Sequence, residues 1–353
     1  MRQIENIFSR QIEGKKTPSV IYAFFDKDTV IYSNATGYKN VKSMEGVDFS
    51  TTYNLFSLTK TFTALAILQF VQEGKVQLNS PASHYLPGFP YSDEITVEQL
   101  LTHTSGIPSP MPMKWIRLAN EQREFNRDLF FNDVFKRHSR LVHKPGTKFK
   151  YSNLGYVLLG RLIESVTGEA YEGYITRCII DRAGVSHDSL GFVINDELQA
   201  TGYQRTWSLG NVLLGYLLDK KKFMRDTEKG WSPFNNFYVN GISYGGLIGS
   251  IEGLIKYAQA LIHKDSTLLN EKHKQILFSE NQIGSHRTGM SHAWFRGFLK
   301  GHPYVTHAGG GGGYYSELRI YPELEVGSAI IFNRSGFVDE RILNKVDGNF
   351  LSQ

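Results

Sequence analysis

The most informative stretch of the chain is FSLTKTFTALAILQFV, residues 56–71. Its apolar residues recur at helical spacing and Gly74 follows closely, so the stretch predicts a long core helix. Residues three apart share one helix face, so the Ser57 hydroxyl and the Lys60 amine would point into the same site. A serine hydroxyl needs a neighbouring base, and a buried lysine with a lowered pKa can be that base. The stretch therefore predicts a covalent acyl-transfer site.

The Ser-x-x-Lys pattern is not specific when taken alone. Serine and lysine are common, so a chain of this length contains about one such pair by chance. The alternative interpretation is a serine in the first turn of a core helix, with a lysine extending from its edge to solvent. The rest of the sequence must decide between the two.

Composition indicates a soluble globular protein of one large or two intertwined domains. The chain has 353 residues, 41% of them hydrophobic and 21% charged, with a mild formal net charge of +5. The densest basic cluster, Lys220–Lys222 with Arg225, is interleaved with Asp219, Asp226 and Glu228. This pattern favours a solvated surface loop over a nucleic-acid site, so we expect no nucleic-acid partner.

The cysteine content and the N-terminal residues limit the kinds of site and the cellular location that the protein can have. Cys178 is the only cysteine, which excludes an internal disulfide and a cysteine metal cluster, and we expect no metal or cofactor. The first residues lack the apolar core of a signal peptide, and no apolar run is long enough to span a bilayer. We therefore expect a cytoplasmic protein, or an exported one if a leader has been removed. The sequence does not indicate an oligomeric state.

Hydrophobic patterning predicts strands at both ends of the chain and helices between them. The strands are expected at residues 19–25, 29–33, 304–307, 315–321 and 326–332. The helices are expected at residues 1–14, 95–102, 115–140, 155–166 and 251–262. We therefore predict an α/β (α+β) fold, with an antiparallel sheet built from both termini and flanked by helices. Residues 1–78 and 244–353 would form this discontinuous sheet domain, residues 79–243 an inserted, mainly helical domain, and the active site would lie at their interface.

A Ser-Lys pair needs a second proton carrier, and a tyrosine can serve because a neighbouring cation lowers the pKa of a phenol. Tyr-x-Asn occurs four times, beginning at Tyr32, Tyr38, Tyr151 and Tyr238. Tyr151 lies between a Pro-Gly loop and the helix expected from residue 155, so both sides of it are held rigidly. Functional residues favour such loops, which selects Tyr151.

A glycine run, residues 309–313, follows His307 and Ala308 at the end of an expected strand. Glycine lets a backbone approach a ligand without a Cβ in the way. A backbone N–H at this edge, together with the N–H of Ser57, would form an oxyanion hole. The alternative is a glycine-rich turn beside an edge histidine.

A competing nucleophile is Ser243, in the pattern Gly-Ile-Ser-Tyr-Gly at residues 241–245. Asp265 and His307 follow it in the order of an α/β-hydrolase triad. Such an elbow must follow a buried parallel strand, however, and residues 237–240 are a poor candidate. We therefore interpret residues 241–245 as a turn.

Three motifs in order, Ser57-Leu58-Thr59-Lys60, Tyr151-Ser152-Asn153 and His307-Ala308-Gly309, make this chain resemble the beta-lactamase-related serine hydrolases. That family includes class C beta-lactamases, D-alanyl-D-alanine carboxypeptidases, D-aminopeptidases and esterases. Residues 101–107 and 245–250 are similar to further landmarks of the family, and the resemblance runs from about residue 50 to 336.

The resemblance implies a beta-lactamase/transpeptidase-like fold and a role for each motif. Ser57 would be the acyl-accepting nucleophile, and Lys60 and Tyr151 the proton network. His103 would belong to a structural turn. The residues implied to bind substrate or the oxyanion are Asn153, His307, Ala308, Gly309 and Gly310.

One departure from the family bears on the substrate. Penicillin hydrolases of this group usually carry Lys-Thr-Gly where this chain has His307-Ala308-Gly309. A lysine places a fixed charge near a substrate carboxylate, whereas histidine is largely neutral above its pKa. We therefore expect hydrolysis of small esters or of D-amino-acid amides and peptides. The alternatives are a class C-like beta-lactamase and a penicillin-binding-like module or pseudoenzyme with little turnover.

Overall fold

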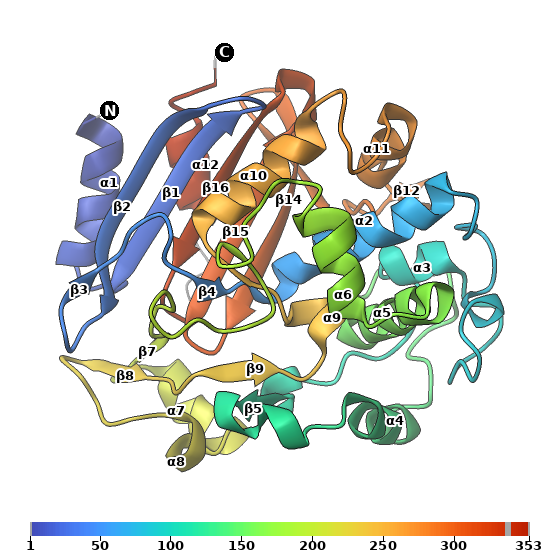
Figure 1. Cartoon of the computed structure of the whole chain (residues 1–353), viewed down its shortest axis with the longest axis horizontal. Coiled ribbons are helices and arrows are strands. Elements are labelled where there is room, and N and C mark those ends of the chain that lie inside the picture. Colours follow the sequence, from blue (N-terminus) through green and yellow to red (C-terminus); the bar gives the residue numbers. More distant parts are fainter. Residues whose placement is uncertain (1, 336–339, 352–353) are drawn as a thin grey trace.

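The central sheet has seven strands in the order β13-β14-β15-β16-β1-β2-β3 in the computed structural model, which describes residues 2–335 and 340–351 (Figure 1). Its strands are β1 (Ser19–Asp26), β2 (Val30–Asn40), β3 (Glu45–Gly46), β13 (Phe295–Leu299), β14 (His302–Gly311), β15 (Tyr314–Tyr321) and β16 (Val326–Phe332). All six pairings are antiparallel, and β1 pairs with β16, with Ala23 opposite Ala329. The expected antiparallel sheet built from both ends of the chain is confirmed.

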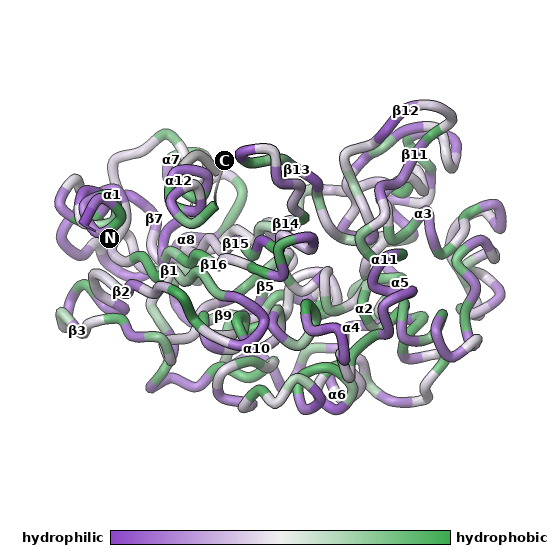
Figure 2. The backbone as a smooth tube through the Cα atoms, turned by 90° about the horizontal axis from the view of Figure 1, so that it is seen from above, coloured by the Kyte–Doolittle hydropathy of each residue, from purple (hydrophilic) through white to green (hydrophobic). Residues whose placement is uncertain are grey.

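Both faces of the sheet are covered, which explains why β1 is apolar without interruption. Tyr22 and Phe24 belong to a core under α1 (Arg2–Glu13) and α12 (Glu340–Asp347). Ala23 and Phe25 face the larger core on the other side, which α10 (Ile251–Ile262) covers (Figure 1). Figure 2 shows hydrophobic colour along β1 and β16 and a largely hydrophilic α1. Strands buried on both faces need no polar alternation.

Helix α2 (Thr59–Gln72) crosses the centre of the larger core. All of its residues from Thr59 to Phe70 are buried, so its apolar residues are not confined to one face. The remaining helices are α3 (Val97–Leu101), α4 (Arg127–Arg137), α5 (Asn153–Thr167), α6 (Tyr171–Ile175), α7 (Leu209–Leu217), α8 (Lys220–Phe223), α9 (Ile242–Gly245) and α11 (Glu271–Phe278). In the described part of the chain, no helix has the length and apolar character needed to cross a membrane.

Several elements follow the local sequence pattern closely. Helix α10 has the predicted bounds, and α5 ends one residue beyond its predicted end, before Gly168, whose φ of +71° is the left-handed conformation of a C-cap. One continuous core contains residues of α2, α5 and α10. No gap in packing therefore marks the boundaries expected at residues 78 and 243, and the division into two domains remains a prediction.

The expected helix at residues 115–140 is wrong at its start and is broken in two, because Ala119–Glu124 forms a separate 3₁₀ helix, η4. Residues Ile116–Leu118 form β5, which pairs with β9 (Phe237–Val239), and only Arg127–Arg137 is α-helical. The partner of β5 lies more than 100 residues away, so no local pattern could indicate it. Strand β13 was also not predicted. The other short strands are β4 (Tyr53–Asn54), β6 (Leu190–Gly191), β7 (Tyr203–Arg205), β8 (Trp231–Pro233), β10 (Ile248–Gly249), β11 (Gln282–Ile283) and β12 (His286–Arg287).

Candidate active site

Ser57 and Lys60 meet at the N-terminal end of α2. Ser57 lies in a single 3₁₀ turn, η1 (Phe56–Leu58), that leads directly into the helix. The Lys60 amine donates a hydrogen bond to Ser57 Oγ at 3.0 Å and another to the Tyr244 carbonyl oxygen at 2.8 Å. Phe56 has a φ of +46°, a conformation that costs a non-glycine residue about 1–3 kcal/mol and that clusters at functional sites.

The Lys60 amine is enclosed by aromatic rings rather than by carboxylates. Its nitrogen lies 4.9 Å from the ring centroid of Tyr151, 5.1 Å from that of Tyr244 and 5.6 Å from that of Tyr156. Among the residues that the structure describes, no acidic side chain forms an ion pair with it. Burial therefore lowers the pKa of Lys60 well below its ordinary value. An amine in this state can accept a proton from Ser57.

Tyr151 and His307 face each other across the site. The Nδ1–H of His307 donates to the Ala293 carbonyl, so in the neutral ring Nε2 is the acceptor. The Tyr151 hydroxyl donates to this Nε2 at 3.4 Å. Burial, followed by the charge of Lys60, lowers the pKa of His307 to about 3, against the effect of the Ala293 hydrogen bond. His307 is therefore a neutral wall of the site near neutral pH.

The expectation that a lysine cation lowers the pKa of Tyr151 is wrong. Burial raises the pKa of this phenol above its ordinary value, and a hydrogen bond with Ser57 only opposes that effect. The same burial disfavours the charged form of Lys60. A neutral amine does not stabilise a Tyr151 phenolate, so Lys60 does not lower the pKa of the phenol. Tyr151 thus keeps its proton near neutral pH.

His103 holds the chain on both sides of Tyr151. Its carbonyl accepts from the Lys150 N–H at 2.8 Å, and its Nδ1 accepts from the Ser152 N–H at 3.1 Å. Its ring lies against that of Tyr151, with centroids 4.2 Å apart. The sequence placed His103 in a structural turn, but gave no indication that this turn supports the tyrosine.

Asn153 is the first residue of α5, whose N-terminus is capped by the Ser152 hydroxyl accepting from the Gly155 N–H at 3.1 Å. The Asn153 side chain is buried, and its Oδ1 has no hydrogen-bond partner among the described residues. Buried polar atoms are normally paired, so this oxygen is available to a ligand donor. The competing Tyr238 lies in β9, where its hydroxyl accepts from the Ile194 N–H at 3.1 Å.

The glycine run of β14 packs directly against η1. A Cβ on Gly309 would lie 1.9 Å from the Leu55 carbonyl oxygen and 3.0 Å from the Ser57 nitrogen, so only glycine fits. Gly310 is exposed, and a Cβ there would meet nothing closer than 3.5 Å. Ala308 differs from its neighbours, because its side chain packs on the core under α1. Only the backbone of Ala308 can contribute to the site.

Ser243 does not have the surroundings of a nucleophile. Its hydroxyl is buried and donates to the Tyr156 carbonyl oxygen at 2.8 Å. A Cβ on Gly160 would lie 2.4 Å from this hydroxyl, which leaves no space for a substrate. The preceding strand, β9, pairs antiparallel with β5 and belongs to no parallel sheet in the described residues. Residues 241–245, interpreted above as a turn, form the short helix α9 after Gly241, and their surroundings are not those of a nucleophile elbow.

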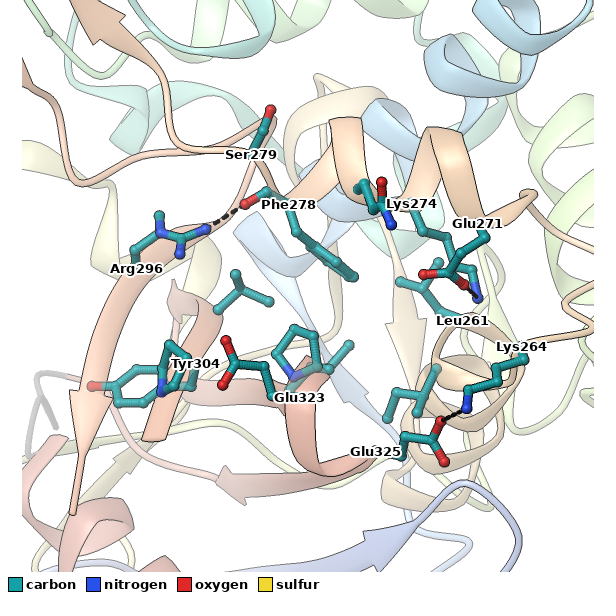
Figure 3. A pocket seen from close by; sticks show the side chains of 16 residues that line it. Leu261, Lys264, Glu271, Lys274, Phe278, Ser279, Arg296, Tyr304, Glu323 and Glu325 are labelled. Atoms are coloured by element: carbon teal, nitrogen blue, oxygen red, sulfur yellow. Dashed lines mark hydrogen bonds and ion pairs between the residues drawn. The ribbon is translucent and has the colours of Figure 1, made fainter. Parts of the chain in front are cut away.

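A separate pocket of about 320 Å³ lies between α10, α11, β13 and β14 (Figure 3). Two lysines that line it pair with two of its glutamates: Lys264 with Glu325 at 3.3 Å and Lys274 with Glu271 at 2.8 Å. None of the predicted site residues lines this pocket. In residues 2–335 and 340–351, no three histidine, cysteine or carboxylate side chains are grouped as metal ligands would be.

Comparison with known families supports the assignment made from the sequence. The family model described as Beta-lactamase matches residues 4–349, nearly the whole chain and more than the resemblance covered. Protein flp of Staphylococcus aureus (strain N315) is 33% identical over 211 residues, 58% of this chain and 41% of that protein. Penicillin-binding protein 4* of Bacillus subtilis (strain 168) is 26% identical over 304 residues, 83% of this chain and 63% of its own length. The aligned part thus spans less than two thirds of either relative.

Solved structures show the same fold. The octameric penicillin-binding protein homologue from Pyrococcus abyssi superposes with a TM-score of 0.80 at 26% identity, over 99% of this chain and 76% of that one. The D-amino acid amidase from Ochrobactrum anthropi SV3, complexed with D-phenylalanine, has a TM-score of 0.80 at 20% identity, over 99% and 98% of the two chains. The expected family of serine hydrolases and its beta-lactamase/transpeptidase-like fold are confirmed.

Proposed function

The chain belongs to the beta-lactamase family, and on that premise we propose that it is a serine acyl hydrolase that forms an acyl-enzyme on Ser57. One observation carries the proposal. The Lys60 amine lies 3.0 Å from Ser57 Oγ, fully buried and without an ion-pair partner in the described residues. Desolvation favours the neutral amine. This amine still donates a hydrogen bond to the Tyr244 carbonyl oxygen, and its lone pair can accept the proton of Ser57.

The proposed proton route uses one base and one acid. Lys60 accepts the Ser57 proton as Oγ bonds to the substrate carbonyl carbon. Tyr151, which burial keeps protonated, gives its phenolic proton to the leaving oxygen or nitrogen as that bond breaks. The proton held by Lys60 then restores the phenol. Water attacks the ester in the second half-reaction, releasing the acid and the free serine.

The backbone of η1 and β14 would stabilise the tetrahedral intermediate. The close approach of Gly309 to Ser57 supports an oxyanion hole formed by the N–H groups of Ser57 and Gly310. The unpartnered Asn153 Oδ1 would accept a hydrogen bond from an amide N–H of the substrate. His103 acts through Tyr151 and is therefore a positioning residue.

The neutral His307 supports small esters, or D-amino-acid amides and peptides, as the substrate class. With a pKa of about 3 it offers no fixed cation to a substrate carboxylate near neutral pH. The D-amino acid amidase named above shares the fold, which supports D-amino-acid amides as one of the proposed substrate types. A class C-like beta-lactamase is the second candidate, because the Ser57–Lys60–Tyr151 arrangement would also accept a beta-lactam.

A third candidate is a penicillin-binding-like module that acylates and turns over slowly. Fluorophosphonate labelling followed by intact mass and peptide mapping distinguishes these possibilities from a protein that only binds. We expect one adduct, on Ser57, that is lost in Ser57→Ala and retained in Ser243→Ala. An adduct that persists in Ser57→Ala would overturn the assignment of the nucleophile.

A substrate panel then identifies the reaction. We expect p-nitrophenyl esters or D-amino acid amides to be turned over faster than nitrocefin. Faster hydrolysis of nitrocefin than of every ester and amide would make the chain a beta-lactamase. Stoichiometric acylation without turnover on any of the three would make it a penicillin-binding-like module.

A further inference from the structure

Helix α7 carries an apolar stripe that faces solvent instead of the core. Leu209, Val212, Leu213 and Tyr216 follow the spacing i, i+3, i+4 and i+7, which places them on one helix face. Their side chains are 76%, 59%, 52% and 83% exposed, and Trp207, just before the helix, is 91% exposed. We call these five residues the α7 surface. In a soluble protein such a stripe normally points inward, so its opposite orientation needs an explanation.

Packing of the helix against the protein does not supply that explanation. Leu214 is the only buried residue of α7. The helix belongs to a segment between β7 and β8, and these two strands pair with each other from Tyr203–Pro233 to Arg205–Trp231. The segment is therefore anchored at its base and projects the α7 surface outward, beside α8 at the edge of the molecule (Figure 1).

Basic residues flank this apolar stripe in the sequence. Residues 205–229 contain six lysines and arginines against three acidic residues, 6 − 3 = +3. Helix α8 folds back on α7, because the Lys220 amine donates to the Asn211 carbonyl. Asp219 is occupied in capping α8 through the Lys222 N–H. Lys221 and Lys229 are exposed and form no ion pair with any residue that the structure describes.

We propose that the α7 surface docks on a lipid bilayer that carries anionic headgroups. Leucine and valine side chains on one face would enter the acyl boundary, while Trp207 and Tyr216 suit the interfacial level. The flanking lysines would meet the phosphates and carboxylates of the headgroups. A helix of nine residues buries little area, so the binding is peripheral and reversible. This inference does not depend on the proposed hydrolase activity.

The charge around the stripe favours a lipid surface over a second copy of the chain. Two copies meeting through this surface would bring two basic rims together and repel each other. An anionic bilayer instead attracts the rim, and each lysine near the surface adds to the attraction until salt screens it.

Tryptophan fluorescence with vesicles tests the proposal on the intact chain. Trp207 is 91% exposed, whereas Trp115, Trp231 and Trp294 are at most 7% exposed, so a spectral change on binding reports mainly on Trp207. With vesicles of phosphatidylcholine containing phosphatidylserine, we expect a blue shift and co-sedimentation at least tenfold above that with phosphatidylcholine alone. We expect the binding to weaken as salt is raised. Absence of binding to both vesicles would overturn the proposal.

Variants on exposed positions separate the apolar and the basic contributions. Leu209→Ser/Leu213→Ser should reduce vesicle binding at least tenfold, and Lys221→Glu/Lys229→Glu should abolish the preference for anionic vesicles. Phe298→Ser is the matched control, because Phe298 is 68% exposed on β13, and it should bind as the parent does. Equal binding by Leu209→Ser/Leu213→Ser would overturn the assignment to α7. A concentration-dependent dimer lost in that variant, without vesicle binding by the parent, would replace the bilayer with a second copy.

Discussion

Two cations are fully buried on opposite sides of the same sheet, and their surroundings differ. Lys60, in the larger core, contacts a hydroxyl, a carbonyl and three aromatic rings. Arg319 of β15, on the side of α12, lies 3.1 Å from a carboxylate oxygen of Glu317 and 3.5 Å from one of Asp347. Asp347 in turn accepts hydrogen bonds from two tyrosines and a serine, each at 2.8 Å.

These surroundings have opposite effects on the two charges. Burial opposes both cations, but at Arg319 the carboxylates of Asp347 and Glu317 outweigh it and raise the pKa of the guanidinium. At Lys60 nothing compensates for burial, and the pKa falls. The comparison shows that a buried charge serves structure where carboxylates neutralise it, whereas a buried amine without them is suited to exchange a proton.

Replacing Lys60 gives the largest expected effect. Lys60→Met removes the base while keeping a side chain of similar length, so turnover should fall by roughly 10⁴-fold. Stability should rise by about 1–2 kcal/mol, because an uncompensated amine leaves the core. Ester turnover and urea unfolding measure the two changes. A variant that is both inactive and less stable would show that Lys60 has a compensating partner.

Replacing Arg319 should change stability instead of activity. Arg319→Met leaves two carboxylates without their cation and should cost about 3–5 kcal/mol in urea unfolding. The folded fraction should keep its kcat. The control is Arg319→Met combined with Glu317→Gln and Asp347→Asn, which removes the unpaired charges and should recover much of the loss. Equal instability of both variants would assign the effect to packing.

Two neighbouring glycines of β14 test whether catalysis depends on the position of the backbone N–H groups as well as on the protonation state of Lys60. Gly309→Ala drives a Cβ into the Leu55 carbonyl and should reduce kcat by roughly 10²-fold by displacing the oxyanion donors. Gly310→Ala keeps its N–H, meets nothing closer than 3.5 Å, and should remain close to the parent. Steady-state kinetics with an ester substrate measure kcat for the two variants. Similar losses of kcat in both would contradict the proposed geometry.

A positive charge can be tested at the wall of the site opposite Tyr151 through His307→Lys. A charge-assisted hydrogen bond to a substrate carboxylate contributes about 1–3 kcal/mol, so kcat/KM for carboxylate-bearing beta-lactams should rise about tenfold relative to neutral esters. His307→Gln keeps the position neutral and should not produce this gain. An unchanged ratio in His307→Lys would mean that the substrate carboxylate lies elsewhere.

The smallest expected effect is a pH dependence that Lys60 has and Arg319 lacks. Between the lowered folded-state pKa of Lys60 and its ordinary value, the unfolded chain holds a proton that the folded chain does not. The stability of the parent relative to Lys60→Met should therefore rise with pH in that window. The kcat/KM should fall as pH drops through the folded-state pKa. His307, with a pKa of about 3, should add no further limb near neutrality. Stability differences that do not vary with pH would contradict the lowered pKa.

Elements with local sequence signals could be predicted before the fold was known. The three-residue spacing of Ser57 and Lys60 on a helix, the stop of α5 at Gly168 and the bounds of α10 depend on nearby residues and on backbone preference. The antiparallel sheet built from both termini could be predicted in outline, because strand patterns lie at both ends of the chain and helical patterns between them. The three family motifs, taken in order along the chain, indicated which residues belong to one site.

The electrostatics of the site depend on residues that are far apart in the sequence. The Tyr244 carbonyl reaches Lys60 from 184 residues away, and His103 holds the Tyr151 loop from about 50 residues away. The raised pKa of Tyr151, the neutral state of His307 and the packing of the Ala308 side chain on the core under α1 depend likewise on their surroundings. Desolvation is a property of the assembled core, so a pattern that places a lysine beside a serine cannot say whether that lysine is charged.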